Sequence, residues 1–396
     1  MELKPGYKQT EVGVIPQDWE VFSVFEMADK QKTRFDDGDW IESEHITDKG
    51  IRLIQTGNIG VGEYVEKEAK KYIYETSFDR LKCKELRVGD LLICRLAEPA
   101  GRTCILPNIG EKKVVTSVDV TIFRPDETKF DRGYFAQYCS TPQWFGAILK
   151  SVGGTTHKRI SRSALGSMQL PVPPFPEQSA VATALSDTDA LLSALDALIA
   201  KQRAIKQGAM QALLTGKRRL PGFGGEWETK RLGEVLAVHH GKNQKEVEAD
   251  DGEFPILATG GQIGWARESL YNKPSVLIGR KGTIDRPQYM DTPFWTVDTL
   301  FFTEIKDVNV AKFFFYRFCL IDWMQYNEAS GVPSLNARTI ENIEIVCPQP
   351  EEQAAIVEVL SAIDVQLAAL EAQREKTALL KQGMMQELLT GRTRLK

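Results

Sequence analysis

The most constraining feature of this 396-residue chain is a long segment that occurs twice. The stretch KQGAMQALLTGKRRL at 206–220 matches KQGMMQELLTGRTRL at 381–395 in eleven of fifteen positions. The match continues upstream without a gap, at a constant offset of 175 residues, to Glu177 and Glu352. Loops admit insertions between repeats, so an ungapped match of this length predicts a rigid element that the chain builds twice.

Each copy has the apolar spacing of a helix. Apolar side chains recur at alternating steps of four and three residues, which is typical of helices that supercoil about one another. The alternative is that each helix packs only on the core of its own domain. The residues of the predicted seam are Val181, Leu185, Leu192, Leu195 and Ile199 in the first copy, and Ile356, Leu360, Ile363, Leu367 and Leu370 in the second.

Start and stop signals bound both helices. Prolines precede each copy, and Gly216 and Gly391 follow, as expected for helix beginnings and ends. A helix over 178–215 would be roughly 57 Å long, at about 1.5 Å per residue. We predict antiparallel pairing, because the linker over 217–228 then needs only to turn the chain into the next domain.

A globular segment precedes each helix, and the two segments begin and end alike. Each opens near a Trp-Glu pair, at Trp19 and Trp227, and closes with an aromatic helix, a glycine turn and a short strand. The aromatic side chains are interpreted as core. Between these flanks the two segments diverge in sequence and differ in length.

The predicted fold class is therefore α/β (α+β), with two copies of one domain joined by two long antiparallel helices. These helices form a coiled-coil spacer with pseudo-two-fold symmetry. The predicted parts are a first domain at 1–172, a first spacer helix at 173–216, a second domain at 217–346 and a second spacer helix at 347–396.

One motif is common to both interiors, a strand followed by a basic glycine turn. The turn carries Arg95 and Arg102 in the first domain, and Arg280 and Lys281 in the second. Cationic side chains beside backbone N–H groups suit phosphate contact and the bidentate reading of guanine, although a solvated hairpin is the alternative. The candidate DNA-binding residues are Arg95, Arg102, Lys158, Arg159, Lys242, Arg280, Lys281 and Arg286.

The sequence lacks the motifs of several enzyme classes. It has no phosphate-binding G-x-x-x-x-G-K-[ST] loop and no nucleophile elbow. Two near matches to the tetrad of amino-methyltransferases, DTPF at 291–294 and VPPF at 172–175, each miss an essential residue. Six cysteines lie far apart without a C-x-x-C pair, which favours a reduced cytoplasm over a disulfide framework or a zinc site. No export signal or membrane span is indicated.

In the order and duplication of these motifs, the chain resembles the specificity subunits of Type I restriction-modification systems over essentially its whole length. The resemblance rests on Trp19 and Trp227, the RKGT turn at 280–283, the P-x-x-x-E-Q helix openings and the LLTG endings. It implies two target-recognition domains, each reading one half of a split double-stranded DNA sequence, and two antiparallel helices as a spacer.

The resemblance also implies a division of labour. Two methylation subunits would carry S-adenosylmethionine and methylate adenine, and restriction subunits would use ATP with Mg²⁺. This chain would hold no cofactor or metal and would have no catalytic residue. Its two unlike domains would read two different half-sites, with centres on the order of one DNA turn apart, 34–36 Å.

Two other functions stay open. The net charge of -4 is unusual for a DNA-binding chain and would suit a coiled-coil protein–protein adaptor that never contacts DNA. A self-sufficient methyltransferase is disfavoured by the two incomplete tetrads, and bound S-adenosylmethionine on the isolated chain would revive it.

Overall fold

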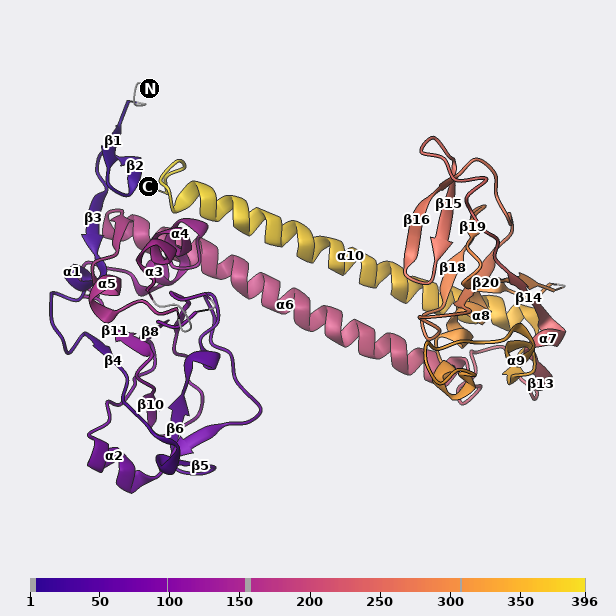
Figure 1. Ribbon diagram of the computed structural model, residues 1–396, viewed down its shortest axis with the longest axis horizontal. Coiled ribbons are helices and arrows are strands. Elements are labelled where there is room, and N and C mark those ends of the chain that lie inside the picture. Colours follow the sequence, from indigo (N-terminus) through magenta and orange to yellow (C-terminus); the bar gives the residue numbers. More distant parts are fainter. Residues whose placement is uncertain (1–4, 98, 154–157, 307, 396) are drawn as a thin grey trace. The chain divides into compact units, whose positions relative to one another are not determined.

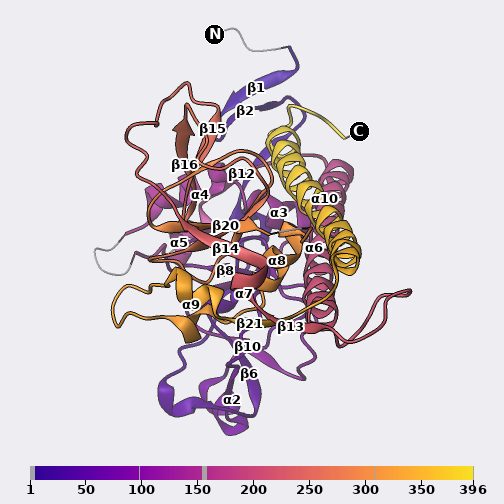
Figure 2. The same ribbon diagram turned by 90° about the vertical axis from the view of Figure 1, so that its right-hand side faces the viewer.

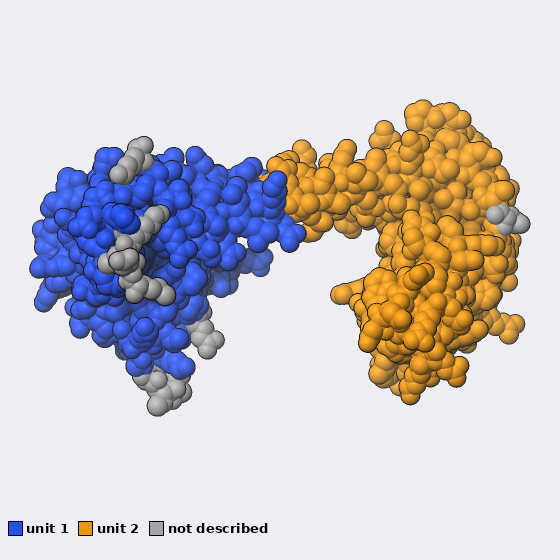
Figure 3. All heavy atoms as spheres, turned by 90° about the horizontal axis from the view of Figure 1, so that it is seen from above, with its two compact units in different colours: residues 1–194, 374–396 blue, residues 195–373 orange. Residues whose placement is uncertain are grey.

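The computed structural model describes residues 5–97, 99–153, 158–306 and 308–395. The chain packs into two compact units, Met1–Ala194 with Arg374–Lys396, and Leu195–Gln373 (Figure 3). We call the globular part of the first unit the first head, and that of the second unit the second head. Each unit combines its head with part of both long helices.

The two repeated segments form helices α6 (Phe175–Leu213) and α10 (Pro350–Leu388), each of 39 residues. At about 1.5 Å per residue each helix is roughly 58 Å long. α6 begins three residues before the predicted start at residue 178 and ends two before residue 215. Gly216 and Gly391 follow the helices at φ 72° and 69°, a left-handed conformation that glycine adopts without strain at helix ends.

Within each unit the two helices run antiparallel (Figure 1, Figure 2). In the second unit Lys206 Nζ lies 2.6 Å from Asp364 Oδ1, and Arg203 donates to Glu371 at 2.6 Å, so the partner number rises as the α6 number falls. In the first unit Lys381 Nζ lies 2.5 Å from Asp189 Oδ1. These ion pairs join the two helices within each unit, as antiparallel pairing predicts.

The predicted seam is buried by two different partners. Val181 and Leu185 of α6 pack into the core of the first head together with Leu388 of α10. Ile356 and Leu360 of α10 do the same in the second head. The remaining seam residues are buried at Leu195 and Ile199, and half-buried at Leu192, Ile363, Leu367 and Leu370. Packing on the heads and packing between helices are therefore combined.

The helices also leave apolar side chains in water. In the second unit Leu198 and Ile205 of α6 are 49% and 46% exposed. Among the described residues, α10 is the one helix long and apolar enough to cross a membrane by length and composition; its 18-residue window has a mean hydropathy of 1.5, and 17% of it is buried.

The first head contains two four-stranded sheets, ordered β4-β11-β8-β9 and β10-β6-β7-β5, and the pairs β3-β12 and β1-β2. Its strands are β1 (Tyr7–Thr10), β2 (Gly13–Pro16), β3 (Glu20–Ser23), β4 (Phe35–Asp37), β5 (Ile46–Thr47), β6 (Ile51–Ile54), β7 (Lys71–Ile73), β8 (Leu91–Cys94), β9 (Thr103–Ile105), β10 (Val114–Thr116), β11 (Val120–Phe123) and β12 (Gln169–Val172). Its helices are α1 (Val24–Met27), α2 (Glu75–Leu81), α3 (Arg132–Tyr138), α4 (Pro142–Ser151) and α5 (Arg162–Gly166).

The second head contains a four-stranded sheet ordered β14-β20-β17-β18, a three-stranded sheet ordered β16-β15-β19 and the pair β13-β21. Its strands are β13 (Glu228–Arg231), β14 (Leu236–His240), β15 (Phe254–Ala258), β16 (Gly261–Ala266), β17 (Ser275–Gly279), β18 (Gln288–Met290), β19 (Trp295–Thr296), β20 (Leu300–Ile305) and β21 (Glu344–Cys347). Its helices are α7 (Leu232–Val235), α8 (Ala311–Phe318) and α9 (Ala337–Glu341).

The two heads share one topology, as the prediction of two copies of one domain requires. β4-β11-β8-β9 matches β14-β20-β17-β18 in order, and each head has one parallel pair, β6 with β10 and β15 with β19. In each head the chain crosses at a glycine from the four-stranded sheet just compared to the sheet with the parallel pair, and we call this residue the crossover glycine. Gly38 N–H donates to Val120 O at 2.9 Å in the first head, and Gly241 N–H donates to Leu300 O at 3.2 Å in the second. β5 and α2 of the first head have no counterpart between β14 and β17 among the described residues of the second head.

The aromatic helices belong to the core, as predicted. Tyr134 and Trp144 in the first head, and Phe313 and Trp323 in the second, are almost completely buried. Their burial anchors α3, α4 and α8 beside the long helices and accounts for the matched sequence at the end of each head.

Candidate nucleic-acid interface

The basic turn occupies the same structural position in both heads. Arg95 follows β8 and donates its N–H to Asp119 O at 2.8 Å; Arg280 follows β17 and donates its N–H to Thr299 O at 2.8 Å. In each head the guanidinium also donates to the carbonyl of the residue before that acceptor, at 2.6 Å from Arg95 and 3.1 Å from Arg280. The backbone frame around these two arginines is therefore the same.

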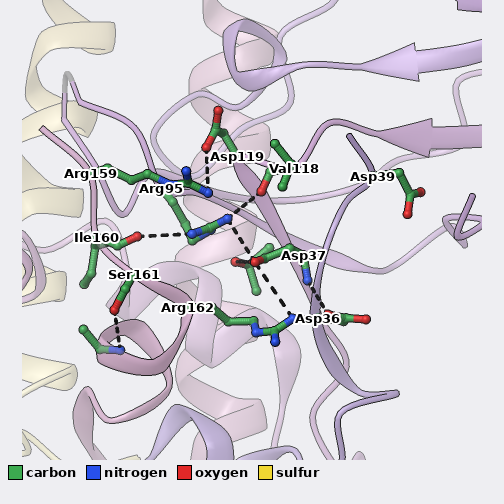
Figure 4. Close-up of polar contacts among 12 residues, drawn as sticks. Asp36, Asp37, Asp39, Arg95, Val118, Asp119, Arg159, Ile160, Ser161 and Arg162 are labelled. Atoms are coloured by element: carbon green, nitrogen blue, oxygen red, sulfur yellow. Dashed lines mark hydrogen bonds and ion pairs between the residues drawn. The ribbon is translucent and has the colours of Figure 1, made fainter. Parts of the chain in front are cut away.

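Arg95 is buried, so its prediction as a DNA contact is wrong for this structure. It is 3% exposed, its guanidinium lies 3.0 Å from Asp37 Oδ2, and it donates to Ile160 O at 3.4 Å (Figure 4). Burial lowers the pKa of the Arg95 guanidinium, and the carboxylate of Asp37 opposes that shift. The arginine joins β4, β8 and the segment before α5, and DNA has no access to it.

The other predicted residues of the first head differ in availability. Arg102 donates to the carbonyls of Ile59 at 2.9 Å and Thr56 at 3.2 Å, so it supports the turn from within. Arg159 is half-buried and lies 3.0 Å from Asp119 (Figure 4). Lys158 is exposed. Of these three, Lys158 is the most accessible to a phosphate.

In the second head the charged neighbours of the equivalent arginine are missing. The residue directly before the crossover glycine is His240, where the first head has Asp37. The residue bridged to the basic turn is Ser334, where the first head has Arg159. No ion pair among the described residues includes Arg280. Its guanidinium is therefore available to an outside acceptor in a way that Arg95 is not.

Three further cations of the second head are exposed: Lys242, Lys281 and Arg286. Lys242 directly follows the crossover glycine and donates its N–H to Thr296 O at 2.8 Å, so its backbone is fixed while its side chain reaches solvent. Lys281 follows Arg280 in the turn, and Arg286 lies before β18. Such an arrangement can donate to phosphate oxygens or to base acceptors. The contacts themselves stay predictions.

A family model of the Type I restriction modification DNA specificity domain matches this chain twice, at residues 16–204 and 224–380. The chain belongs to this family. Over most of its length it is similar to the Type I restriction enzyme MjaVIII specificity subunit of Methanocaldococcus jannaschii, with 23% identity covering 96% of this chain and 94% of that one.

Solved structures of Type I systems share the fold. The crystal structure of a Type I restriction-modification S subunit from M. genitalium superposes with a TM-score of 0.66, at 17% identity and covering 98% of both chains. A chain from a structural study of complex assembly and conformational transition in the Type I system gives a TM-score of 0.52, at 15% identity, covering 95% of this chain and 99% of that chain.

The repeated tryptophan and glutamate of this specificity-family chain form a buried cluster, which we call the clasp. In the first unit Trp19 Nε1 donates to Glu177 Oε2 at 3.2 Å. Arg394 donates to both oxygens of Glu177 at 2.6 Å and stacks 5.7 Å from the Trp19 ring centre. Glu177 and Asp18 together raise the pKa of the Arg394 guanidinium.

The second unit repeats the clasp. Trp227 Nε1 donates to Glu352 Oε2 at 3.0 Å, and Arg219 donates to both oxygens of Glu352 at 2.6 Å. Sequence reasoning noted the tryptophans and glutamates separately and missed the arginines. The signal was present, because Arg219 and Arg394 lie at the same 175-residue offset as the glutamates.

Proposed function

We propose that this chain is the non-catalytic specificity subunit of a Type I restriction-modification complex and reads an asymmetric, bipartite DNA target. One observation carries the proposal: two heads of one topology present different side chains around the same basic turn. Asp37 and Arg159 surround the turn in the first head, and His240 and Ser334 replace them in the second.

Unlike heads imply unlike half-sites. A dimer of identical heads reads a palindrome, because both heads select the same bases. Here the side chains that could reach base edges differ, so the target has two different halves. Helices α6 and α10 would set the gap between them, because a continuous helix is stiff over its length.

The exposed apolar side chains of the helices support a scaffold role. Leu198 and Ile205 lie seven residues apart on one side of α6, and Val359 and Val365 of α10 are also exposed in the same unit. A rigid apolar stripe of this kind suits a partner that supplies helices. Methylation subunits, holding S-adenosylmethionine, are the proposed partners, with restriction subunits using ATP and Mg²⁺ joining the same complex.

Exchange of the second head tests the reading function. If residues 217–346 are replaced by the same part of another specificity subunit, the methylated motif is expected to change in one half-site and to stay unchanged in the other. Mapping methylated adenines in cells that express the complex gives the answer. A change in both halves would contradict modular reading, and partner assembly without any DNA binding would favour the adaptor function.

A charged pair in the apolar stripe tests the scaffold function. Leu198→Glu with Ile205→Glu is expected to weaken binding of the methylation subunits at least about tenfold, because two aliphatic side chains lose their apolar contacts. Binding is measured by titration of the purified chain. The control is Gln207→Glu, which adds a charge on the opposite side of α6 at about 100° per residue. Equal weakening by both would contradict the stripe.

A further inference from the structure

The first head contains an open depression of about 600 Å³ at one edge of its sheet β10-β6-β7-β5. β6 and β10 are parallel neighbours in that sheet. Their carboxyl ends therefore lie at the same edge, where the chain continues into Gln55 and Ser117, two residues of the wall. Side chains converge on a ligand at such edges, because the loops after parallel strands meet there.

Four side chains of this wall can contact a nucleic acid. Trp40, two residues after Gly38, is 68% exposed, and its indole Nε1 donates to Glu42 at 3.1 Å. The Asn58 N–H donates to the backbone carbonyl of Gln55 at 2.8 Å, so the side-chain amide of Gln55 makes no cap hydrogen bond and can donate to a ligand. Lys67 and Lys71 are exposed, and no ion pair among the described residues includes either of them.

The far wall of the depression is held rigidly. Arg52, 1% exposed, donates to Lys71 O at 3.0 Å and to Glu66 Oε1 at 2.7 Å. Asn58 is also buried and donates to Val65 O at 2.9 Å. The segment that carries Lys67 and Lys71 is therefore fixed to β6 at several points. A fixed wall lowers the conformational entropy that is lost when a ligand binds.

Opposite charges near the depression do not cancel these lysines. The carboxylates of Asp39 and Asp119 line the same wall, but Asp39 lies 3.2 Å from Lys84 and Asp119 lies 3.0 Å from Arg159. Both acids are thus already paired. Among the described residues, the unpaired charges that remain on the wall are Lys67, Lys71 and the exposed Glu68 between them, so two lysines outnumber one acid and favour a polyanion.

The corresponding place in the second head carries different groups. β15 and β19 are the parallel pair there, and Ala258 and Val297 follow the paired Leu257 and Thr296 as Gln55 and Ser117 follow the paired Ile54 and Thr116. Gln288 donates to Ala258 O at 2.9 Å. A specificity-determining site requires that the same backbone position carry different side chains in the two heads, and this position meets that requirement.

We propose that the first head reads its DNA half-site at this depression. Gln55 donates its amide to an acceptor on a base edge, Trp40 packs its exposed ring against the sugar or base beside it, and Lys67 and Lys71 contact phosphates. Side-chain amides and lysines are common partners of base edges and phosphates, and aromatic rings stack on bases. The proposal rests on the proposed function and assigns base reading to residues outside the basic turn.

A single substitution at Gln55 tests the base contact. In the complex of the full chain with its methylation subunits, Gln55→Ala is expected to reduce discrimination at one base position of one half-site by roughly 5- to 150-fold. The other half-site serves as an internal control. The motif is measured by sequencing methylated adenines in genomic DNA. An unchanged motif overturns the role of Gln55.

Two further variants separate the phosphate contacts from the base contact. Lys67→Ala with Lys71→Ala is expected to weaken binding to target and random duplexes alike, and to lower the slope of log affinity against log salt by about 1.8. Trp40→Ala is expected to weaken binding, while Tyr74→Ala, an exposed aromatic of the same head outside the depression, leaves it unchanged.

The outcomes distinguish this inference from the proposed function. If the wild-type complex methylates a bipartite motif and all three variants keep its motif, affinity and salt slope, the depression does not read DNA and the proposed function stands. If the wild-type complex shows no sequence-specific binding or methylation, both fail. If a variant loses base discrimination at a position in one half-site only, that result supports both the inference and the proposed function.

Discussion

Replacing Arg394 with alanine is expected to destabilise the first unit by about 3 kcal/mol. Its guanidinium holds both oxygens of Glu177 at 2.6 Å, and Glu177 is 4% exposed. Without Arg394 that carboxylate stays buried with the Trp19 N–H as its remaining partner in the clasp, and an uncompensated buried charge is costly. Denaturant unfolding followed by tryptophan fluorescence measures the loss, because Trp19 lies in the clasp.

The matched control lies two residues away. Arg392 is 67% exposed and lies 3.8 Å from Glu387, so Arg392→Ala is expected to change stability by less than about 0.5 kcal/mol. Combining Arg394→Ala with Glu177→Gln should recover part of the loss, since a neutral amide is less costly to bury than an unpaired carboxylate. Equal effects of Arg394→Ala and Arg392→Ala would show that the clasp does not stabilise the unit.

The long helices could be predicted from sequence because their signals are local and repeated. The constant 175-residue offset excludes loops, and the spacing of Leu185 and Leu360 with their neighbours follows a helical period. Prolines and glycines then bound each helix to within three residues. The pattern could not show whether a head or the other helix buries a given apolar residue, because both kinds of packing require apolar residues on the same side of the helix.

The strand order that the two heads share could not be predicted from sequence. Their strands are two to six residues long, too short for a clear period. What the heads share is backbone hydrogen bonding, such as the N–H of Gly38 and Gly241. Hydrogen bonds between backbone groups constrain the side-chain sequence little, except at positions such as Gly38 and Gly241, where the structure leaves no room for a side chain.

The candidate site shows the same limit. Arg95 and Arg280 occupy the same turn, and the sequence pattern predicts DNA contact for both. The burial of Arg95 depends on Asp37, a residue from a distant strand that becomes His240 in the second head. The depression beside Trp40 was missed for a related reason, because separate segments of the chain build its wall. Whether a cationic side chain reaches solvent therefore depends on residues that are distant from it in sequence.

Gly241→Ala, which adds a methyl group, is expected to destabilise the second head by about 3 kcal/mol. A Cβ there would overlap the carbonyl oxygen of Val297 and lie 2.6 Å from that of Thr296. Both obstacles are backbone atoms, so no side chain can rotate away. Relief requires the crossover to move, which breaks the hydrogen bonds of Gly241 to Leu300 and of Lys242 to Thr296. For a unit of this size the melting temperature should fall by roughly 6–12 °C.

Gly260→Ala is the matched control in the same head. A Cβ at Gly260 would meet no atom within 4 Å, so its melting temperature should stay within about 2 °C of wild type. Gly38→Ala should reproduce the large effect in the first head, because a Cβ there would overlap Ser117 O and lie 2.5 Å from Thr116 O. Since Lys242 directly follows Gly241, the same shift should also weaken DNA binding by the second head. A stable Gly241→Ala protein with unchanged DNA affinity would show that the crossover does not position Lys242.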